Sequence, residues 1–153
     1  MMLKAKELDY WHAYIGPLKH KPENATVEAG MAGNNEIADE LLDLFLRGRK
    51  TAASGLVKDY QLSGDPLPEI GNYWIILDSN KTPKCIVKTI GIELHQFDQV
   101  PETIAIAEGE GDLSLDYWRK AHIDFFTPFL RDWGITDLNK ETVITEFYQI
   151  VYK

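Results

Sequence analysis

Two neighbouring runs of strand-forming residues constrain the fold of this chain more than any other feature. Residues 73–77 read YWIIL and residues 84–94 read KCIVKTIGIEL, and both are rich in β-branched and aromatic side chains. The DSNKTP segment between them has the composition of a turn. We therefore expect an antiparallel hairpin in the middle of the fold. Cys85, within the second run, is interpreted as a buried core thiol.

Helical spacing of apolar residues flanks this hairpin on both sides. It predicts a short helix around Leu8 and a second helix capped by Asn34 or Asn35. A short helical piece is expected from Pro101, followed by a longer helix capped by Ser114. These elements are not arranged in strict alternation with strands, so the pattern favours a mixed α+β domain over a doubly wound sheet.

The two ends of the chain differ in how clearly they can be interpreted. Residues 16–30 contain prolines and glycines and are expected to form a loop. Residues 141–153 are dense in β-branched and aromatic side chains and predict a C-terminal strand. A small barrel with flanking helices accommodates these elements.

Composition excludes several classes of protein. A chain of 153 residues is long enough for one ordinary domain, and its net charge of −8 disfavours broad attraction to nucleic acid. One cysteine excludes an intrachain disulfide and any multi-cysteine metal site. The chain contains no signal-peptide or membrane-span pattern, so we expect a cytoplasmic location and no membrane association. No metal ion or organic cofactor is implied.

The acidic stretch AEGEGD, residues 107–112, places three carboxylates among glycines. An EF-hand loop is excluded, because Leu113 occupies the position of the sharp-turn glycine. The structural interpretation is a glycine-shaped loop in which Asp112 complements the start of the next helix. That interpretation leaves Glu110 unexplained, and a carboxylate between two glycines is also a suitable general acid or base.

The cationic segment GRKT follows a predicted helix. Arg47, Arg49 and Lys50 offset the negative end of the helix dipole, which is a sufficient structural reason for them. The functional interpretation is a local basic patch on an acidic protein, with the hydroxyls of Thr51 and Ser54 beside it.

Aromatic and histidine side chains give weaker indications. Tyr73 with Trp74, and Tyr117 with Trp118, could stack a nucleobase, although large aromatic residues at these spacings more often belong to a core. His122 lies on the aromatic face of the predicted helix and is interpreted as a core or boundary residue.

Three blocks, taken in order, resemble the ASCH family, which is named for activating-signal-cointegrator homology. They are ADELLDLFLRGRKTA, then DPLPEIGNYWIIL with KCIVKTIGIEL, and then FDQVPETIAIAEGEGDLSLDYWRKAHIDFF. The resemblance divides the chain into an N-terminal extension, residues 1–33, and an ASCH domain, residues 34–153. It implies a PUA-like fold, which is a small mixed β-barrel flanked by helices.

The resemblance also implies a cleft in which the GRKT segment faces the EGEGD loop. PUA-like domains commonly bind RNA or modified bases, so the resemblance implies binding of single-stranded RNA, a nucleotide or a modified nucleoside as the expected function. The ligand-binding residues would be Arg47, Arg49, Glu108, Asp112 and Trp118, beside the paired Lys50 and Glu110.

Related proteins suggest an alternative, hydrolysis of the acyl amide of N4-acylated cytidine or cleavage of single-stranded RNA. Carried over to this chain, Lys50 is the base and Glu110 the proton-transfer carboxylate. The family pattern K-T-x-T places its second threonine at Ala53, whose methyl group is no nucleophile. Thr51 or Ser54 would replace it only with a different local backbone, so the sequence favours binding. A third hypothesis is an interaction protein in which Lys50 and Glu110 form a structural ion pair.

Overall fold

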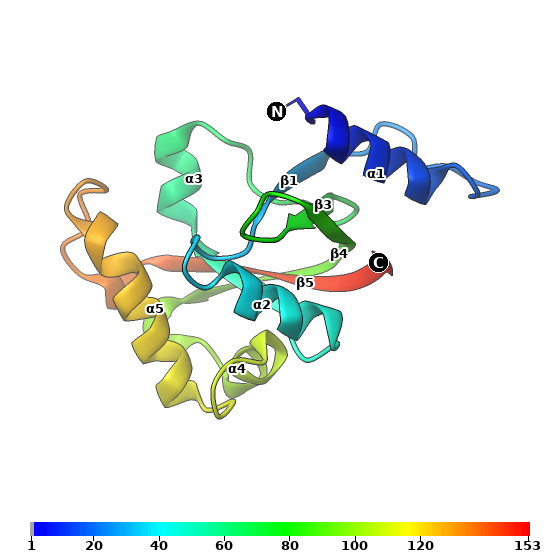
Figure 1. Ribbon diagram of the computed structural model, residues 1–153. Helices are drawn as coiled ribbons and strands as arrows, with labels where there is room; N and C mark the ends of the chain where they lie inside the picture. The colour runs from blue at the N-terminus through cyan, green and yellow to red at the C-terminus, as the bar shows by residue number, and fades with distance from the viewer. Residues whose placement is uncertain (1) are drawn as a thin grey trace. The chain divides into compact units, whose positions relative to one another are not determined.

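The computed structural model describes residues 2–153, which form five α-helices, two short 3-10 helices and five β-strands. The strands are β1 (Val27–Met31), β2 (Ala52–Leu56), β3 (Tyr73–Leu77), β4 (Pro83–Gln96) and β5 (Thr142–Tyr152) (Figure 1). The helices are α1 (Ala5–Ile15), α2 (Ala38–Leu46), α3 (Val57–Ser63), α4 (Glu102–Glu108) and α5 (Leu115–Leu130), with η1 (Phe97–Gln99) and η2 (Leu138–Lys140).

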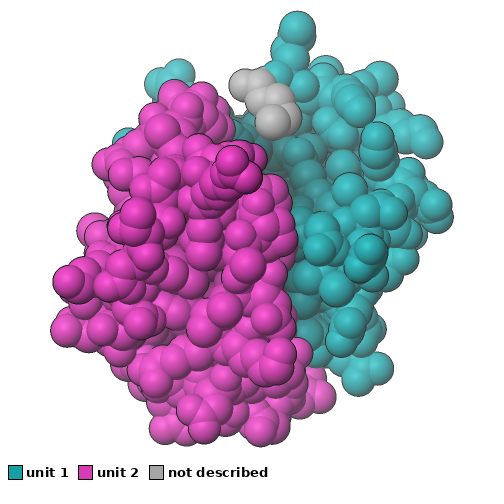
Figure 2. All heavy atoms as spheres, turned by 90° about the vertical axis from the view of Figure 1, so that its left-hand side faces the viewer, with its two compact units in different colours: residues 1–48, 69–90, 148–153 teal, residues 49–68, 91–147 magenta. Residues whose placement is uncertain are grey.

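The chain divides into two compact units. The first consists of the residues up to 48 with residues 69–90 and 148–153, and the second of residues 49–68 and 91–147 (Figure 2). The long strands β4 and β5 each contribute residues to both units. Each unit is thus assembled from segments that are distant in sequence.

The first unit contains the predicted hairpin. β3 pairs antiparallel with β4, with Tyr73 opposite Lys88, and β1 adds to the other edge of β3 in parallel. Trp11 of α1 packs into an apolar core whose other buried residues are Tyr73, Ile75, Leu77 and Ile86. The hairpin and the N-terminal helix are thus confirmed.

Cys85 has no exposed surface, as expected of a core thiol. Burial raises the pKa of this thiol to about 12, because the thiolate would lose its hydration.

The second unit combines β2, β5 and the helices that follow β4. β2 pairs antiparallel with the first half of β5, from Ala52 opposite Phe147 to Leu56 opposite Val143. One apolar cluster joins β2 and β5 to α4 and α5; its buried members are Leu56, Phe97, Val100, Ile104, Ala105, Trp118, Phe126 and Val143. This cluster holds the C-terminal end of α4 and the N-terminal part of α5, which carry residues of the candidate site.

The fold differs from the sequence expectations at three elements. The end of the expected loop at residues 16–30 is strand β1, and neither β2 nor α3 is indicated by the sequence. β1 pairs with a strand more than forty residues away, and β2 consists of AASGL, whose small residues carry no strand pattern. Tertiary pairing decides both strands.

The α+β class is confirmed, because β3 pairs in parallel with β1 and antiparallel with β4, and α-helices accompany these strands. Ser114 caps α5 as predicted, by accepting a hydrogen bond from the backbone N–H of Tyr117 (3.0 Å). Pro128 lies inside α5, which continues to Leu130. No helix within residues 2–153 combines the length and the apolarity that a bilayer span needs.

Candidate functional site

The end of α4 and the segment before β2 are fastened together through their backbones. The Thr51 N–H donates to the carbonyl of Ala107 (2.7 Å), and the Thr51 hydroxyl donates to the same oxygen (3.2 Å). Gly109 has a φ of +70°, and a Cβ built on it would lie 2.0 Å from the carbonyl oxygen of Arg49. The first glycine of the EGEGD loop is therefore required by both its conformation and this close approach.

Lys50 is enclosed at this junction, with a side chain only 3% exposed. Its Nζ donates to Glu110 Oε2 (2.8 Å), to Glu108 Oε1 (3.2 Å) and to the carbonyl of Glu108 (3.4 Å). The proximity of Lys50 and Glu110 that the resemblance implies is confirmed. The site places one ammonium between two carboxylates, and Glu110, at 23% exposure, is the carboxylate that reaches solvent.

Glu108 is the buried centre of the site. Its side chain is 3% exposed, and its second oxygen accepts hydrogen bonds from the Ser54 hydroxyl (2.8 Å) and the Trp118 indole N–H. The imidazole of His122 lies 3.6 Å from the same oxygen.

These contacts decide the ionisation of Glu108. Burial, the largest single influence, raises the pKa of the carboxyl. The charge of the Lys50 ammonium is the main influence against burial, and the electrostatic effect of the neighbouring His122 and the hydrogen bonds from Trp118 and Ser54 add to it. The result is a pKa below the ordinary value, so Glu108 is a carboxylate at neutral pH.

A second hydroxyl joins Ser54 in the cluster. Ser54 lies opposite Thr145 in the β2–β5 register, and their hydroxyl oxygens are 2.7 Å apart. Thr145 has no exposed surface. Thr145 was not anticipated from the sequence, although a threonine directly after Val143 and Ile144 in a predicted strand was an available signal.

The structure separates the candidate hydroxyls. Ala53 lies opposite Glu146, and because strand side chains alternate it points to the other face from Ser54. Thr51 is exposed and bonded to the α4 backbone. Ser54 is thus the member of the K-T-A-A-S segment whose hydroxyl enters the cluster of Lys50 and Glu108.

Trp118 and His122 form the wall of the cluster on α5. Their rings stack with centroids 4.0 Å apart, and His122 Nδ1 lies 2.8 Å from the carbonyl of Trp118. Trp118 is only 3% exposed, so its ring holds Glu108 in place rather than offering a surface. His122 is a boundary residue, as predicted, but its contact with Glu108 was not anticipated from sequence.

The remaining predicted residues lie near the surface. Arg47 is in the first unit, where it pairs with Asp43 on α2 (3.0 Å), and Arg49 is exposed in the second. Because Lys50 is buried against carboxylates, the segment presents less positive surface than three free cations would. Asp112 accepts a hydrogen bond from the Ser114 N–H (2.9 Å), and bonding to Ser114 lowers the pKa of its carboxyl.

The described part of the chain contains no group of three side chains arranged to hold a metal ion.

Comparison with known proteins gives the family. The model of the ASCH domain matches residues 28–152. This chain belongs to the ASCH family.

Solved structures agree with this assignment. An ASCH domain from Lactobacillus crispatus is 26% identical, with a TM-score of 0.89 over 99% of this chain and 97% of that one. Protein EF3133 from Enterococcus faecalis is 27% identical, with a TM-score of 0.82 over 95% of this chain and 87% of that one. The predicted PUA-like fold of the ASCH domain is therefore confirmed.

A more distant likeness concerns the fold alone. An ASCH protein from Zymomonas mobilis is 11% identical, with a TM-score of 0.50 over 80% of this chain and 66% of that one. Among proteins of curated function, none matches this ASCH domain.

Proposed function

We propose that this ASCH domain binds single-stranded RNA, a nucleotide or a modified nucleoside at the surface formed by Arg49, Thr51 and Glu110. The observation that carries the proposal is the buried ion-pair cluster beneath this surface. Lys50 and Glu108 are each 3% exposed and bonded to one another, yet a buried pair stabilises a fold no better than well-packed apolar residues. A cluster of charged groups with a shifted pKa is more typical of a functional site.

The chemistry of the exposed part suits such a ligand. Glu110 accepts hydrogen bonds from amino or imino groups of a base, while Arg49 offers a cation for a phosphate. Lys50 holds Glu110 by a 2.8 Å contact, and a carboxylate held in this way loses little freedom when a ligand binds.

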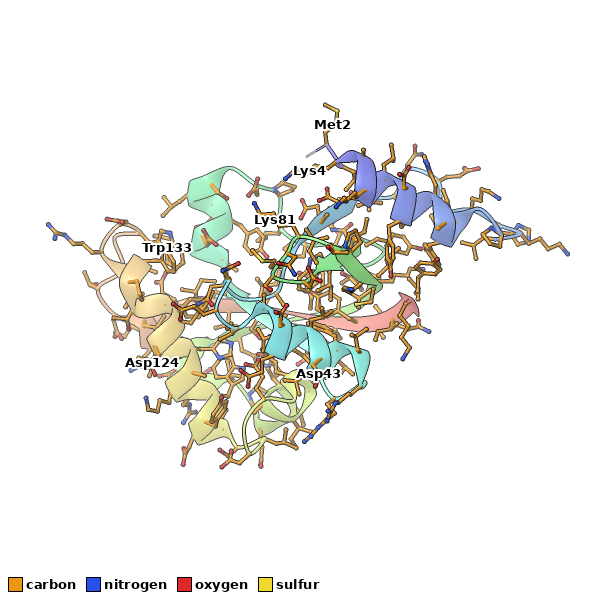
Figure 3. The ribbon with its side chains drawn as sticks, viewed as in Figure 1. Met2, Lys4, Asp43, Lys81, Asp124 and Trp133 are labelled. Carbon is orange, nitrogen blue, oxygen red and sulfur yellow. The ribbon has the colours of Figure 1, made fainter. Side chains whose placement is uncertain are left out.

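Titration of short single-stranded RNAs and of nucleosides at low salt tests the proposal. We expect Arg49→Ala to weaken RNA binding and to reduce its salt dependence, because one phosphate contact fewer releases fewer counterions. Arg131→Ala is the matched control, since Arg131 is exposed just beyond α5. Figure 3 labels Asp124, in the middle of α5, and Trp133, two residues beyond Arg131 in the turn that follows the helix.

The outcome that contradicts binding is specific. Absence of binding to every probe at low salt, or binding that survives Arg49→Ala combined with Lys50→Ala, removes this function.

Hydrolysis is a second candidate, and the position of Ser54 favours it. The Ser54 hydroxyl donates to Glu108 (2.8 Å) in the same cluster as Lys50 and Glu110. A hydroxyl bonded to a carboxylate can lose its proton as it attacks an acyl carbon. Attack on N4-acetylcytidine would transfer the acetyl group to Ser54, with a proton passing to the departing cytidine nitrogen; water would then release acetate.

Cytidine release from N4-acetylcytidine, followed by chromatography, tests this candidate. We expect Ser54→Ala to abolish release and Thr51→Ala to leave most of it, because the Thr51 hydroxyl is bonded to α4 outside the cluster. Cleavage of a labelled single-stranded RNA in the same samples tests the ribonuclease version, for which Lys50→Ala and Glu110→Ala are the informative variants. Turnover that persists in all of these variants would assign the activity to a contaminant.

A further inference from the structure

Tyr117 is an exposed aromatic residue at the start of α5, directly before the buried Trp118. It is 42% exposed, whereas Trp118 is 3% exposed. The N–H of Tyr117 is bonded to the Ser114 hydroxyl (3.0 Å), so the capped first turn of the helix fixes its backbone. The pair of aromatic residues noted in the sequence is thus divided between the surface and the core.

The ring of Tyr117 rests on the backbone of Gly111. A Cβ built on Gly111 would lie 2.5 Å from both Cδ2 and Cε2 of the tyrosine, so any side chain at this position would have to displace the ring. Gly111 also has a φ of +59°. The second glycine of the EGEGD loop therefore lets the aromatic ring lie close against the loop, while Tyr117 as a whole stays 42% exposed.

This arrangement places an aromatic surface on the same loop as the accessible carboxylate of the cluster. Gly111 directly follows Glu110, whose carboxylate is 23% exposed and 2.8 Å from Lys50. An aromatic ring held by backbone contact loses little conformational entropy when a second ring stacks on it. Tyr117 is also the residue of this loop–helix junction that exposes a large ring.

We propose that Tyr117 is the stacking surface for the planar ring of the ligand, which a nucleobase supplies, while Glu110 accepts hydrogen bonds from the edge of that ring. The inference rests on the binding function proposed above and identifies the part of the ligand that the site reads. It makes the base, and not only the phosphate backbone, a determinant of affinity.

The test uses the full chain and two hexaribonucleotide probes. One is an oligoadenylate carrying a single 2-aminopurine, and the other is the same oligomer with abasic riboses. The variants are Tyr117→Ala, Tyr117→Phe and Gly111→Ala. Gly134→Ala is the control for strain, because Gly134 has a φ of +68° but nothing within 4 Å of its built Cβ.

We expect the base-containing probe to bind wild type more tightly than the abasic probe, with quenching of the 2-aminopurine fluorescence that stacking produces. Tyr117→Ala should weaken that binding about 5- to 150-fold, the range for losing one base–aromatic stack, and should abolish the quenching. Tyr117→Phe should retain both properties. Gly111→Ala should resemble Tyr117→Ala because it displaces the ring, whereas Gly134→Ala should bind as wild type does.

The outcomes separate the stacking residue from the function itself. Equal binding of the base-containing and abasic probes, or quenching that survives Tyr117→Ala, overturns the role of Tyr117 while RNA binding stands. Failure of wild type to bind either probe or any nucleoside overturns both. Far-UV circular dichroism of each variant identifies a loss of binding that comes from unfolding, and Tyr117→Phe then still decides whether an aromatic ring is sufficient.

Discussion

Replacement of Lys50 by methionine is the sharpest test of the electrostatics of this site. The substitution keeps most of the side-chain volume and removes the ammonium that lies 3.2 Å from Glu108 and 2.8 Å from Glu110. Glu108 is then a carboxylate at 3% exposure without its nearest cation. Breaking a buried pair from one side typically costs about 3–5 kcal/mol, because the remaining charge cannot regain its hydration.

The loss should be measured as a difference in the free energy of unfolding. For a chain of this size, about 2–4 °C of Tm accompanies each kcal/mol, so we expect Tm to fall by on the order of 10 °C. Urea denaturation at pH 7 gives the free energy directly. The double variant Lys50→Met with Glu108→Gln is the matched control: it removes both charges and should recover about 2 kcal/mol or more of the loss.

The pH dependence gives an independent check. The folded-state pKa of Glu108 lies below its ordinary value of 4.5, so its contribution to stability is present above pH 4.5 and is lost as the pH falls through the folded pKa. In Lys50→Met the same carboxyl gains by taking up a proton, so the deficit of the variant should shrink as the pH is lowered. A deficit below about 1 kcal/mol at pH 7, or a double variant no more stable than the single one, would refute the reasoning.

Two further predictions concern residues outside the ion-pair cluster. Gly109→Ala should destabilise the protein by clearly more than Gly48→Ala: both glycines have positive φ, which costs roughly 1–2 kcal/mol for alanine, but only at Gly109 would the new methyl group meet the Arg49 carbonyl. Equal urea midpoints for the two variants would contradict the close approach. Cys85, whose pKa burial raises to about 12, should resist iodoacetamide at pH 8 in the native protein and react once urea unfolds it. Rapid labelling without denaturant, followed by mass spectrometry, would show that the thiol is accessible.

The fold was predictable where local pattern and final packing agree. YWIIL and its partner strand carry their own β-forming residues, and Ser114 carries its own capping hydroxyl. β1 and β2 were not predictable in this way, because their partners β3 and β5 lie far away in sequence and because β2 is built of small residues. Pairing across such distances depends on the whole fold rather than on a local window.

The residues of the candidate site were likewise predictable only in part. Lys50 and Glu110 were identified through a resemblance that spans 60 positions of sequence, and their contact is present in the structure. Glu108 was predicted to contact the ligand, but in the structure it is the buried centre of the cluster. Thr145 was not anticipated from the sequence. Both roles depend on which side of a strand or helix faces inward, and the β2–β5 register sets this.

The sequence by itself determined the hairpin, the Ser114 cap of α5 and the α+β class, which follow from side-chain period and capping chemistry written locally in the chain. The pairing of the acidic loop with the cationic segment came from the family resemblance, which spans both segments. Only the tertiary structure decided that Ser54, rather than position 53, supplies the hydroxyl, and that Tyr117 is exposed while Trp118 is buried. Those outcomes follow from strand register, from the packing of Gly109 against the distant Arg49 backbone and from that of Gly111 against the Tyr117 ring, contacts that exist only once the chain has folded.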